Sequence, residues 1–294
     1  MIKLIASDMD GTLINSNHEV SSETIKAIKA AQAKGIEFII TTGRSFEDAR
    51  SQVDEAGITC NYLVMNGSEL RDSNGNILQQ LYLDQEIVQK IVDDLLQLDL
   101  CVEVYSTNGT YTLGSLESCK WAVAAKINNF YPEKSVETYY QTAEEHFLFQ
   151  ELNRISDLSE VFEKKYQVGK IICFSPKVET IAFLREDIKQ RYNVNSTGSF
   201  PINLEVTNPL ANKGAALARY AESKNIDITD VMTIGDSFND MTMIDAPFGY
   251  TVAMGNAIEP IKDIAKYLTD SNDNDGVGKI INRLINNTHS EENT

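Results

Sequence analysis

The sequence predicts an α/β fold, in which helices cover both faces of a parallel sheet, interrupted by an inserted α+β segment. Up to about residue 83, short apolar runs alternate with helical patterns, and this alternation is typical of parallel strands joined by helices. The alternation stops after Leu83 and returns from Asn212. The length of 294 residues suits about two domains. We therefore expect one α/β domain formed by both ends of the chain, with the inserted domain between them.

Three strands are predicted in the N-terminal segment. Residues 3–7 form a short apolar run that ends at Asp8. Residues 21–34 have the spacing of a helix, with Ser21 or Ser22 at its N-cap and Gly35 beyond its end. The next predicted elements are a strand over 36–40, a helix that runs to Ala56, a strand over 61–65, and a turn at Asn66 and Gly67.

The middle of the chain has a different pattern. An amphipathic helix is predicted over 85–98, and an antiparallel hairpin over 100–105 and 111–113 turns at Asn108 and Gly109. Further mixed elements are predicted at 171–174, 179–191 and 203–206. Aromatic side chains are frequent in this part, and they either form its own core or stack on a bound sugar or heterocycle. They are Tyr105, Tyr111, Trp121, Tyr131, Tyr139 and Tyr140.

The C-terminal segment returns to the first pattern. Its predicted elements are a helix over 213–223, a strand over 231–234, a strand over 250–253 and a helix over 258–265, and residues 277–285 close the fold. The carboxyl ends of parallel strands meet at one edge of a sheet, and α/β proteins bind ligands there. Polar residues that directly follow the predicted strands are therefore candidate site residues.

Composition excludes several classes of function. The formal net charge of −17 argues against binding to a nucleic-acid backbone. No apolar run approaches the roughly 20 residues that span a bilayer, and Asp8 interrupts the apolar N-terminal stretch too early for a signal peptide. The four cysteines and three histidines are scattered along the sequence, so we expect buried, reduced thiols and neither a zinc site, a Cys-His nucleophile nor a disulfide framework. A soluble, cytoplasmic protein is expected.

Two aspartates follow the first predicted strand. Asp8 and Asp10 are two residues apart and precede Gly11 and Thr12. Their carboxylates would repel each other without a nearby cation, and Gly11 permits an abrupt turn of the backbone. A plain Asp-Gly turn after an edge strand is the alternative, but the position directly after a buried strand favours a site.

Two weaker motifs lie at other element ends. Thr42, Gly43 and Arg44 follow the second strand, where a hydroxyl and backbone amides can bind a phosphoryl oxygen, although the same sequence is an ordinary strand-to-helix connection. Lys213 opens a helix, where the helix dipole disfavours a cation. This lysine therefore either serves a site or is a solvated surface residue.

The last motif is acidic. Gly235 and Asp236 follow the strand at 231–234, and Asn239 and Asp240 come shortly after them. Carboxylate oxygens are the ligands that a hard cation such as Mg²⁺ requires. Because all of these motifs are predicted at one edge of one sheet, we expect them to form a single site.

With these four motifs in this order and at suitable gaps, the sequence resembles the haloacid dehalogenase (HAD) superfamily phosphatases, specifically the Cof-type branch (HAD-IIB, with a C2-type cap). The resemblance extends over nearly the whole chain, and Asn66 and Gly67 also resemble this branch. It implies a Rossmann-like doubly wound parallel sheet as the catalytic core, formed by residues 1–83 and 208–294. It also implies an inserted α+β cap domain at 84–207 that determines substrate specificity.

The resemblance implies a role for each motif residue. Asp8 would attack phosphorus and form an aspartyl-phosphate, and Asp10 would protonate the leaving group and then activate water. Mg²⁺ would be held by the carboxylates of Asp8 and Asp236 and the backbone carbonyl of Asp10. The other implied residues bind the phosphoryl group (Thr42, Gly43, Lys213 and Asn239), orient a water molecule at the cation (Asp240) or contact the substrate (Arg44 and Asn66). A surface ion pair is the alternative for Arg44.

We therefore expect a phosphoric monoester hydrolase: a Mg²⁺-dependent phosphatase for phosphate monoesters of small metabolites, foremost sugar phosphates. The alternatives are a cofactor phosphatase acting on pyridoxal phosphate or flavin mononucleotide (FMN), a phosphomutase, and a non-catalytic phosphometabolite-binding protein. The expected partner is a small phosphorylated metabolite, with neither nucleic acid nor membrane. The protein is expected to be a monomer or a weak homodimer.

Overall fold

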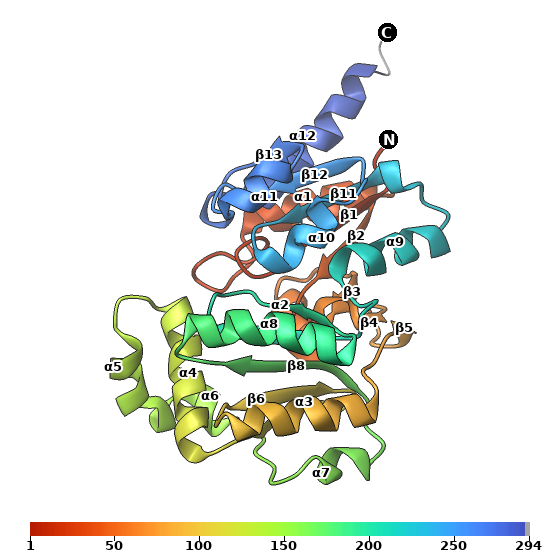
Figure 1. Ribbon diagram of the computed structural model, residues 1–294. Coiled ribbons are helices and arrows are strands. Elements are labelled where there is room, and N and C mark those ends of the chain that lie inside the picture. Colours follow the sequence, from red (N-terminus) through yellow and green to blue (C-terminus); the bar gives the residue numbers. More distant parts are fainter. Residues whose placement is uncertain (292–294) are drawn as a thin grey trace. The chain divides into compact units, whose positions relative to one another are not determined.

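The computed structural model describes residues 1–291, and the chain forms two compact units (Figure 1). Unit 1 comprises Met1–Leu81 and Leu210–Thr294, and unit 2 comprises Tyr82–Pro209. The chain therefore leaves unit 1 after its N-terminal part and returns to it for its C-terminal part.

Unit 1 is built on one sheet, whose strands among the described residues have the order β13-β12-β11-β1-β2-β3-β4-β5. The strands from β13 to β3 are parallel, and β4 and β5 are antiparallel additions at one edge. The elements are β1 (Leu4–Ser7), α1 (Ser22–Ala33), β2 (Glu37–Thr41), α2 (Phe46–Glu55), β3 (Asn61–Val64), the 3-10 turn η1 (Met65–Gly67), β4 (Glu69–Arg71), β5 (Ile77–Gln80), α9 (Lys213–Ser223), η3 (Ile228–Asp230), β11 (Val231–Gly235), η4 (Phe238–Asp240), α10 (Met241–Ile244), β12 (Tyr250–Ala253), α11 (Glu259–Ile264), β13 (Tyr267–Leu268), η5 (Asn272–Asn274) and α12 (Gly276–Glu291).

The centre of this sheet is buried as the apolar runs predicted. Every residue of β1 is buried, as expected for a parallel strand covered on both faces. The helix predicted from Ser21 begins with that residue as its N-cap, because the Ser21 hydroxyl accepts a hydrogen bond from the Thr24 amide at 3.2 Å. Helices α1 and α12 pack against each other, as do α9 and α10.

The antiparallel strands β4 and β5 are absent from the sequence-based prediction. A tight turn joins them, in which Asp72 Oδ1 accepts hydrogen bonds from the amides of Asn74 and Asn76 at 2.9 and 2.8 Å. Parallel neighbours would need a crossover connection of about a dozen residues or more. Because this connection is much shorter, the two strands must be antiparallel. The Asn74–Gly75 dipeptide, with φ +89° at Gly75, is the sequence signal for this hairpin.

Unit 2 contains an antiparallel sheet, whose strands among the described residues have the order β7-β6-β8-β10-β9. The hairpin predicted to turn at Asn108 and Gly109 is confirmed, because Ser106 pairs with Gly109. The elements are α3 (Gln85–Gln97), β6 (Val102–Ser106), β7 (Gly109–Leu113), α4 (Leu116–Phe130), α5 (Val136–Gln141), η2 (Ala143–Glu145), α6 (Phe147–Gln150), α7 (Ser159–Phe162), β8 (Val168–Phe174), α8 (Val178–Tyr192), β9 (Asn195–Thr197) and β10 (Asn203–Thr207).

Two apolar clusters stabilise unit 2. Helices α3 and α8 lie side by side over the sheet (Figure 1) and bury residues such as Ile91 and Ile181 against Val104. Helix α4, which the sequence analysis does not predict, packs residues such as Ala122 against Phe174. Most of the aromatic residues noted in the sequence serve these cores: Tyr111 lies in the first, Tyr105 and Trp121 pack against the second, and Tyr139 packs against a smaller cluster.

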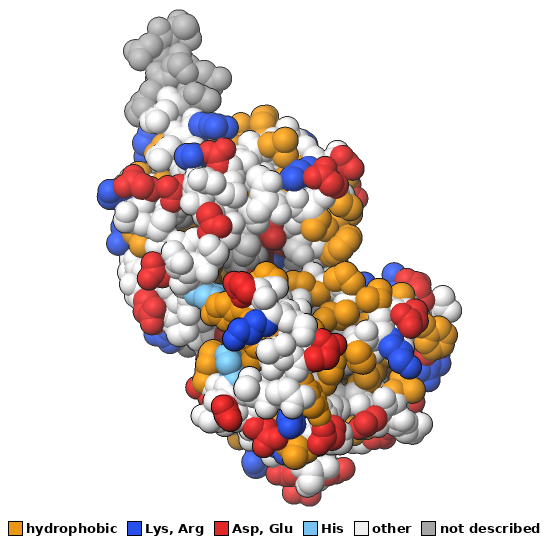
Figure 2. Space-filling view, turned by 90° about the vertical axis from the view of Figure 1, so that its left-hand side faces the viewer, with side chains coloured by type: hydrophobic (Ala, Val, Ile, Leu, Met, Phe, Trp, Pro, Cys, Tyr) orange, Lys and Arg blue, Asp and Glu red, His pale blue; other side chains and the backbone are white. Residues whose placement is uncertain are grey.

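Acidic residues outnumber basic ones in the chain, 43 against 26. On the face shown in Figure 2, acidic and basic side chains are interspersed. Within residues 1–291, no helix has both the length and the apolar character needed to cross a membrane.

Candidate active site

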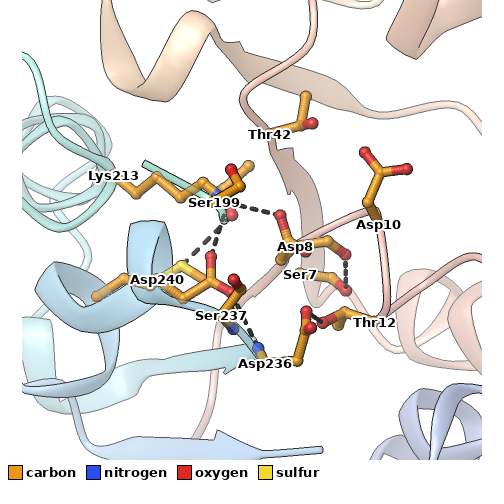
Figure 3. A network of polar contacts seen from close by, with 12 residues as sticks. Ser7, Asp8, Asp10, Thr12, Thr42, Ser199, Lys213, Asp236, Ser237 and Asp240 are labelled. Atoms are coloured by element: carbon orange, nitrogen blue, oxygen red, sulfur yellow. Dashed lines mark hydrogen bonds and ion pairs between the residues drawn. The ribbon is translucent and has the colours of Figure 1, made fainter. Parts of the chain in front are cut away.

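Strand register brings three of the four motifs to one edge of the unit 1 sheet. Ser7, the last residue of β1, pairs with Ile234 of β11 on one side and with Ile40 of β2 on the other. The residues that follow these strands therefore leave the sheet at the same level. The Asp8 amide continues this pairing by donating to the Ile234 carbonyl at 2.9 Å. Asp8, Asp236 and Thr42 accordingly lie around one edge (Figure 3).

Three carboxylates and one ammonium group converge there. Asp8, Asp236 and Asp240 each offer an oxygen, and these oxygens lie within 4.8 Å of one another. Lys213 reaches the group from α9, with its Nζ 2.5 Å from Asp8 Oδ1 and 2.6 Å from Asp240 Oδ1 (Figure 3). The side chains of Lys213 and Asp240 are completely buried. The sequence left open a solvated surface position for Lys213, and that alternative is wrong.

Burial sets the protonation of this cluster. The pKa of Asp8 is raised well above its usual value, by removal from water and by the charge of Asp240. Burial and Asp240 likewise raise the pKa of Asp236 to about 7. Burial alone would lower the pKa of Lys213, but the charges of Asp240 and Asp8 raise it above the usual value, so this lysine stays protonated. When all three carboxylates are ionised, three negative charges face one positive charge, and a divalent cation would cancel the excess and favour the ionised forms.

The loops around the cluster are held by their own polar groups. Asp240 Oδ2 accepts hydrogen bonds from the amides of Asp236 and Ser237 at 2.9 and 3.1 Å. Its other oxygen contacts Lys213, so Asp240 anchors the lysine and the loop rather than offering a free ligand face. The Thr12 hydroxyl donates to Asp236 Oδ1 at 2.7 Å, a role that sequence reasoning missed although Thr12 belongs to the first motif.

Gly11 is required by a close approach. Its φ is +75°, and a Cβ at this position would lie 2.6 Å from Asp236 Oδ2. A side chain here would both strain the backbone and displace the carboxylate. The sequence predicted the abrupt turn but not the neighbour that makes the glycine necessary.

The Asp10 carboxylate lies apart from this cluster. It points away from Asp8 (Figure 3) and accepts hydrogen bonds from Arg44 Nη2 and Nε at 2.6 and 2.8 Å. The pair is partly exposed, with 42% of the Asp10 side chain and 24% of the Arg44 side chain accessible. Of the two alternatives for Arg44, the structure has the ion pair, and its partner is the candidate acid-base residue.

The other predicted residues surround Thr42. Its side chain is 1% exposed, its hydroxyl accepts from the Arg44 amide at 3.2 Å, and its carbonyl accepts from the Asn66 amide at 3.0 Å. Gly43 is half-buried in the same loop. Asn66 adopts φ 55° and is followed by Gly67, whose close contact with Asn212 brings η1 against the start of α9.

Asn239 lies half-buried in η4 next to Asp240. The predicted motif residues all belong to unit 1, and the carboxylate of Asp10 points away from the buried cluster.

A buried charged cluster in unit 2 is also missing from the sequence-based prediction. Lys170 Nζ lies 3.4 Å from Glu205 Oε2 and 4.5 Å from the centre of the Tyr105 ring. Glu103 pairs with Lys126 beside them. Glu103, Lys170 and Glu205 alternate with apolar residues along β6, β8 and β10. This period of two is the sequence signal that the charged side chains lie on the face of the sheet opposite the apolar ones.

Comparison with known proteins identifies the family. A family model for haloacid dehalogenase-like hydrolases matches residues 5–281. The chain belongs to this family.

Similar proteins support the same assignment. The 5-amino-6-(5-phospho-D-ribitylamino)uracil phosphatase YwtE of Bacillus subtilis is 30% identical over 284 residues, covering 97% of this chain and 98% of the relative. Phosphatase YwpJ of the same bacterium is 31% identical, with coverage of 97% and 100%. A solved haloacid dehalogenase-like hydrolase from B. subtilis matches with a TM-score of 0.84 at 31% identity, covering 96% of this chain and all of that one. A solved subclass IIB sugar phosphatase shares the fold, with a TM-score of 0.74 at 22% identity, covering 96% of this chain and 98% of that one.

These findings confirm the HAD fold, the Cof-type branch and the phosphatase class that the four motifs predicted. The chain is a phosphatase of the HAD-IIB group.

Proposed function

We propose that this phosphatase is Mg²⁺-dependent and hydrolyses phosphate monoesters of small metabolites, foremost sugar phosphates, through an aspartyl-phosphate on Asp8. One observation carries the proposal: a buried Asp8 carboxylate is held between a buried lysine and a second aspartate that lies close enough to share a cation with it. An ionised carboxylate in this position is the nucleophile that a covalent mechanism requires.

Asp8 would attack phosphorus, with the bond to the leaving oxygen breaking as the bond to the carboxylate oxygen forms. Lys213 would then bind a phosphoryl oxygen and offset its negative charge in a site shielded from water. The Thr42 hydroxyl, Gly43 and Asn239 would bind further phosphoryl oxygens. Water would finally hydrolyse the aspartyl-phosphate and restore Asp8.

Asp10 would protonate the leaving oxygen and later take a proton from the attacking water. In the structure its carboxylate is held by both nitrogens of the Arg44 fork. Asp10 must therefore exchange this partner for the substrate during the cycle. The partial exposure of the pair supports such a movement, because water can solvate both charged groups once they separate.

The donors present suit Mg²⁺. The carboxylates of Asp8 and Asp236 and the carbonyl of Asp10 would hold the ion, all through oxygen atoms, which Mg²⁺ prefers. The excess negative charge of the buried cluster supports a divalent cation in particular. When bound, Mg²⁺ supplies positive charge that reduces the repulsion between Asp8 and the anionic substrate.

The first test replaces the nucleophile. Asp8→Asn is expected to lower hydrolysis of an aryl phosphate at least about a thousandfold while leaving the fold intact. Asp263→Asn, an exposed aspartate on α11, is the matched control and should hydrolyse the same substrate at the wild-type rate. Near-normal turnover by Asp8→Asn would overturn the covalent mechanism. An inactive wild-type protein that still binds phosphorylated metabolites would favour the non-catalytic alternative.

A cofactor-type phosphate is the second candidate, and the relative YwtE supports it, because its name specifies a phosphate on a ribityl chain joined to uracil. A panel that contains hexose phosphates, pyridoxal phosphate, FMN and 5-amino-6-(5-phospho-D-ribitylamino)uracil separates the candidates by kcat/KM. A preference for hexose phosphates supports the first proposal. A preference for the phosphates that carry a nitrogen heterocycle supports the second.

A further inference from the structure

Two cysteines that are far apart in the sequence meet in unit 2. Cys101 directly precedes β6 and Cys119 is the fourth residue of α4, and their sulfur atoms lie 3.3 Å apart. Both are free and buried, with exposed fractions of 2% and 0%. No part of the phosphatase proposal uses either thiol.

The chain segments that carry the two thiols pack against each other. A Cβ built on Gly114 would lie 3.2 Å from Cys101 Cα, so the segment that leads into α4 lies against Cys101. A disulfide requires sulfur atoms about 2.05 Å apart, so the two sulfur atoms, now 3.3 Å apart, must approach each other by about 1.2 Å.

The two thiols differ in reactivity. The Cys101 thiol donates a hydrogen bond to the Cys119 sulfur. This hydrogen bond, and the positive charge of Arg154, lower the pKa of Cys119 below its usual value. The same contact, together with burial, raises the pKa of Cys101. Because the thiolate is the reactive form, Cys119 is the nucleophile of the pair and Cys101 is the partner that follows.

A cavity lies beside the segment that leads into α4. It has a volume of about 510 Å³, and Gly114, Ser115 and Arg154 line it. Two of its lining residues are therefore Gly114, which lies against the backbone of Cys101, and Arg154, whose charge lowers the pKa of Cys119.

The remaining cysteines, Cys60 and Cys173, lack these features. Burial raises the pKa of each to about 12, which keeps them protonated at neutral pH. They serve as internal controls in the same chain.

We propose that Cys101 and Cys119 are a modification site, at which a peroxide oxidises the two thiols to a reversible disulfide. The Cys119 thiolate attacks one oxygen of the peroxide and becomes a sulfenic acid, while the other oxygen leaves and is protonated to water. The Cys101 sulfur then attacks the Cys119 sulfur and loses its proton, and the hydroxyl group leaves as a second water. The two thiols together lose two electrons, and one molecule of hydrogen peroxide accepts them and is reduced to two molecules of water.

The experiment uses the full-length protein and does not depend on its activity. Reduced protein is treated with hydrogen peroxide, alkylated in denaturant and mapped by mass spectrometry without reduction. We expect a linked peptide pair that contains Cys101 and Cys119, lighter by two hydrogen atoms and separated by dithiothreitol, with Cys60 and Cys173 still alkylated. Cys173→Ser, the matched control in the same unit, should give the same linked pair, whereas Cys119→Ser should give none.

Three results would overturn the proposal. The first is a Cys119 oxidised to sulfinic acid while Cys101 remains a free thiol. The second is a wild-type protein in which all four cysteines are alkylated after peroxide treatment. The third is oxidation of Cys173 at the same rate as Cys119, which would indicate reaction through unfolding. The wild-type map alone decides among these outcomes, so the test holds even where a serine variant fails to fold.

Discussion

Replacement of Lys213 by methionine probes the charge balance of the buried cluster. Methionine keeps an unbranched side chain of similar reach but removes the ammonium group that contacts Asp8 and Asp240 at 2.5 and 2.6 Å. In the Lys213→Met variant, three carboxylates then face one another without a compensating positive charge. Packing is largely preserved, so the loss of stability reports on electrostatics.

The expected magnitude follows from the complete burial of this lysine. Removal of one partner from a buried ion pair costs about 3–5 kcal/mol, and 1 kcal/mol changes the melting temperature of a domain of this size by about 2–4 °C. The variant should therefore unfold roughly 6–20 °C below the wild type at pH 8 in EDTA.

The deficit should depend on pH. The folded-state pKa values of Asp8 and Asp236 are raised above their unfolded values, so the folded protein binds more protons than the unfolded one between about pH 4 and pH 7. Stability contributed by the protonated carboxyls is present at the low end of this window and is lost as the pH rises through it. Because protonation removes the repulsion that Lys213 normally offsets, the penalty of Lys213→Met should shrink toward pH 5.

Thermal unfolding followed by circular dichroism at pH 5 and pH 8 measures both effects. Lys224→Met is the matched control, because Lys224 directly follows the same helix, is half-exposed and has its Nζ 3.8 Å from Glu37 Oε1. Its cost should stay below about 1 kcal/mol at either pH. The reasoning is refuted if both variants unfold at the same temperature at pH 8, or if the Lys213→Met deficit is equal at the two pH values.

Three further predictions concern the same edge of the sheet. Mg²⁺ should raise the melting temperature of the wild type more at pH 8 than at pH 5, because protons compete for Asp8 and Asp236; equal shifts in calorimetry would contradict this. Gly11→Ala should weaken Mg²⁺ binding at least about tenfold and destabilise the fold by about 1–2 kcal/mol, since its Cβ would lie 2.6 Å from Asp236 Oδ2; unchanged calorimetric affinity would show that the loop relaxes. Arg44→Ala should change the free energy of unfolding in urea by less than about 1 kcal/mol, because its pair with Asp10 is partly exposed, and a larger loss would mean that the pair supports the fold.

The site was predictable where it depends on strand order alone. Asp8, Thr42 and Asp236 follow apolar runs, and parallel pairing necessarily brings the ends of such runs to one edge. The predicted helix over 213–223 likewise matches α9. Periodicity and turn residues determine these features locally, so a single sequence contains them.

Features that depend on packing between distant residues were not predictable in this way. Nothing near Asp10 in the sequence specifies that Arg44 contacts its carboxylate, and nothing near Cys101 specifies Cys119 as its neighbour. Helix α4 was missed because its buried residues include the consecutive run 122–125, so its apolar residues show no clear helical period. The short strand β4 was missed because three residues are too few to show a period.

The formation of a covalent intermediate on Asp8 is the most direct test of the proposed mechanism. Wild-type protein is mixed with a fast-reacting phosphate monoester and Mg²⁺, quenched in acid within milliseconds and digested for mass spectrometry. We expect a transient phosphoryl group on the peptide that contains residue 8, formed no more slowly than phosphate is released and absent from the Asp8→Asn variant. Release of phosphate at the full rate with no label on that peptide, or with the label on another residue, would contradict it.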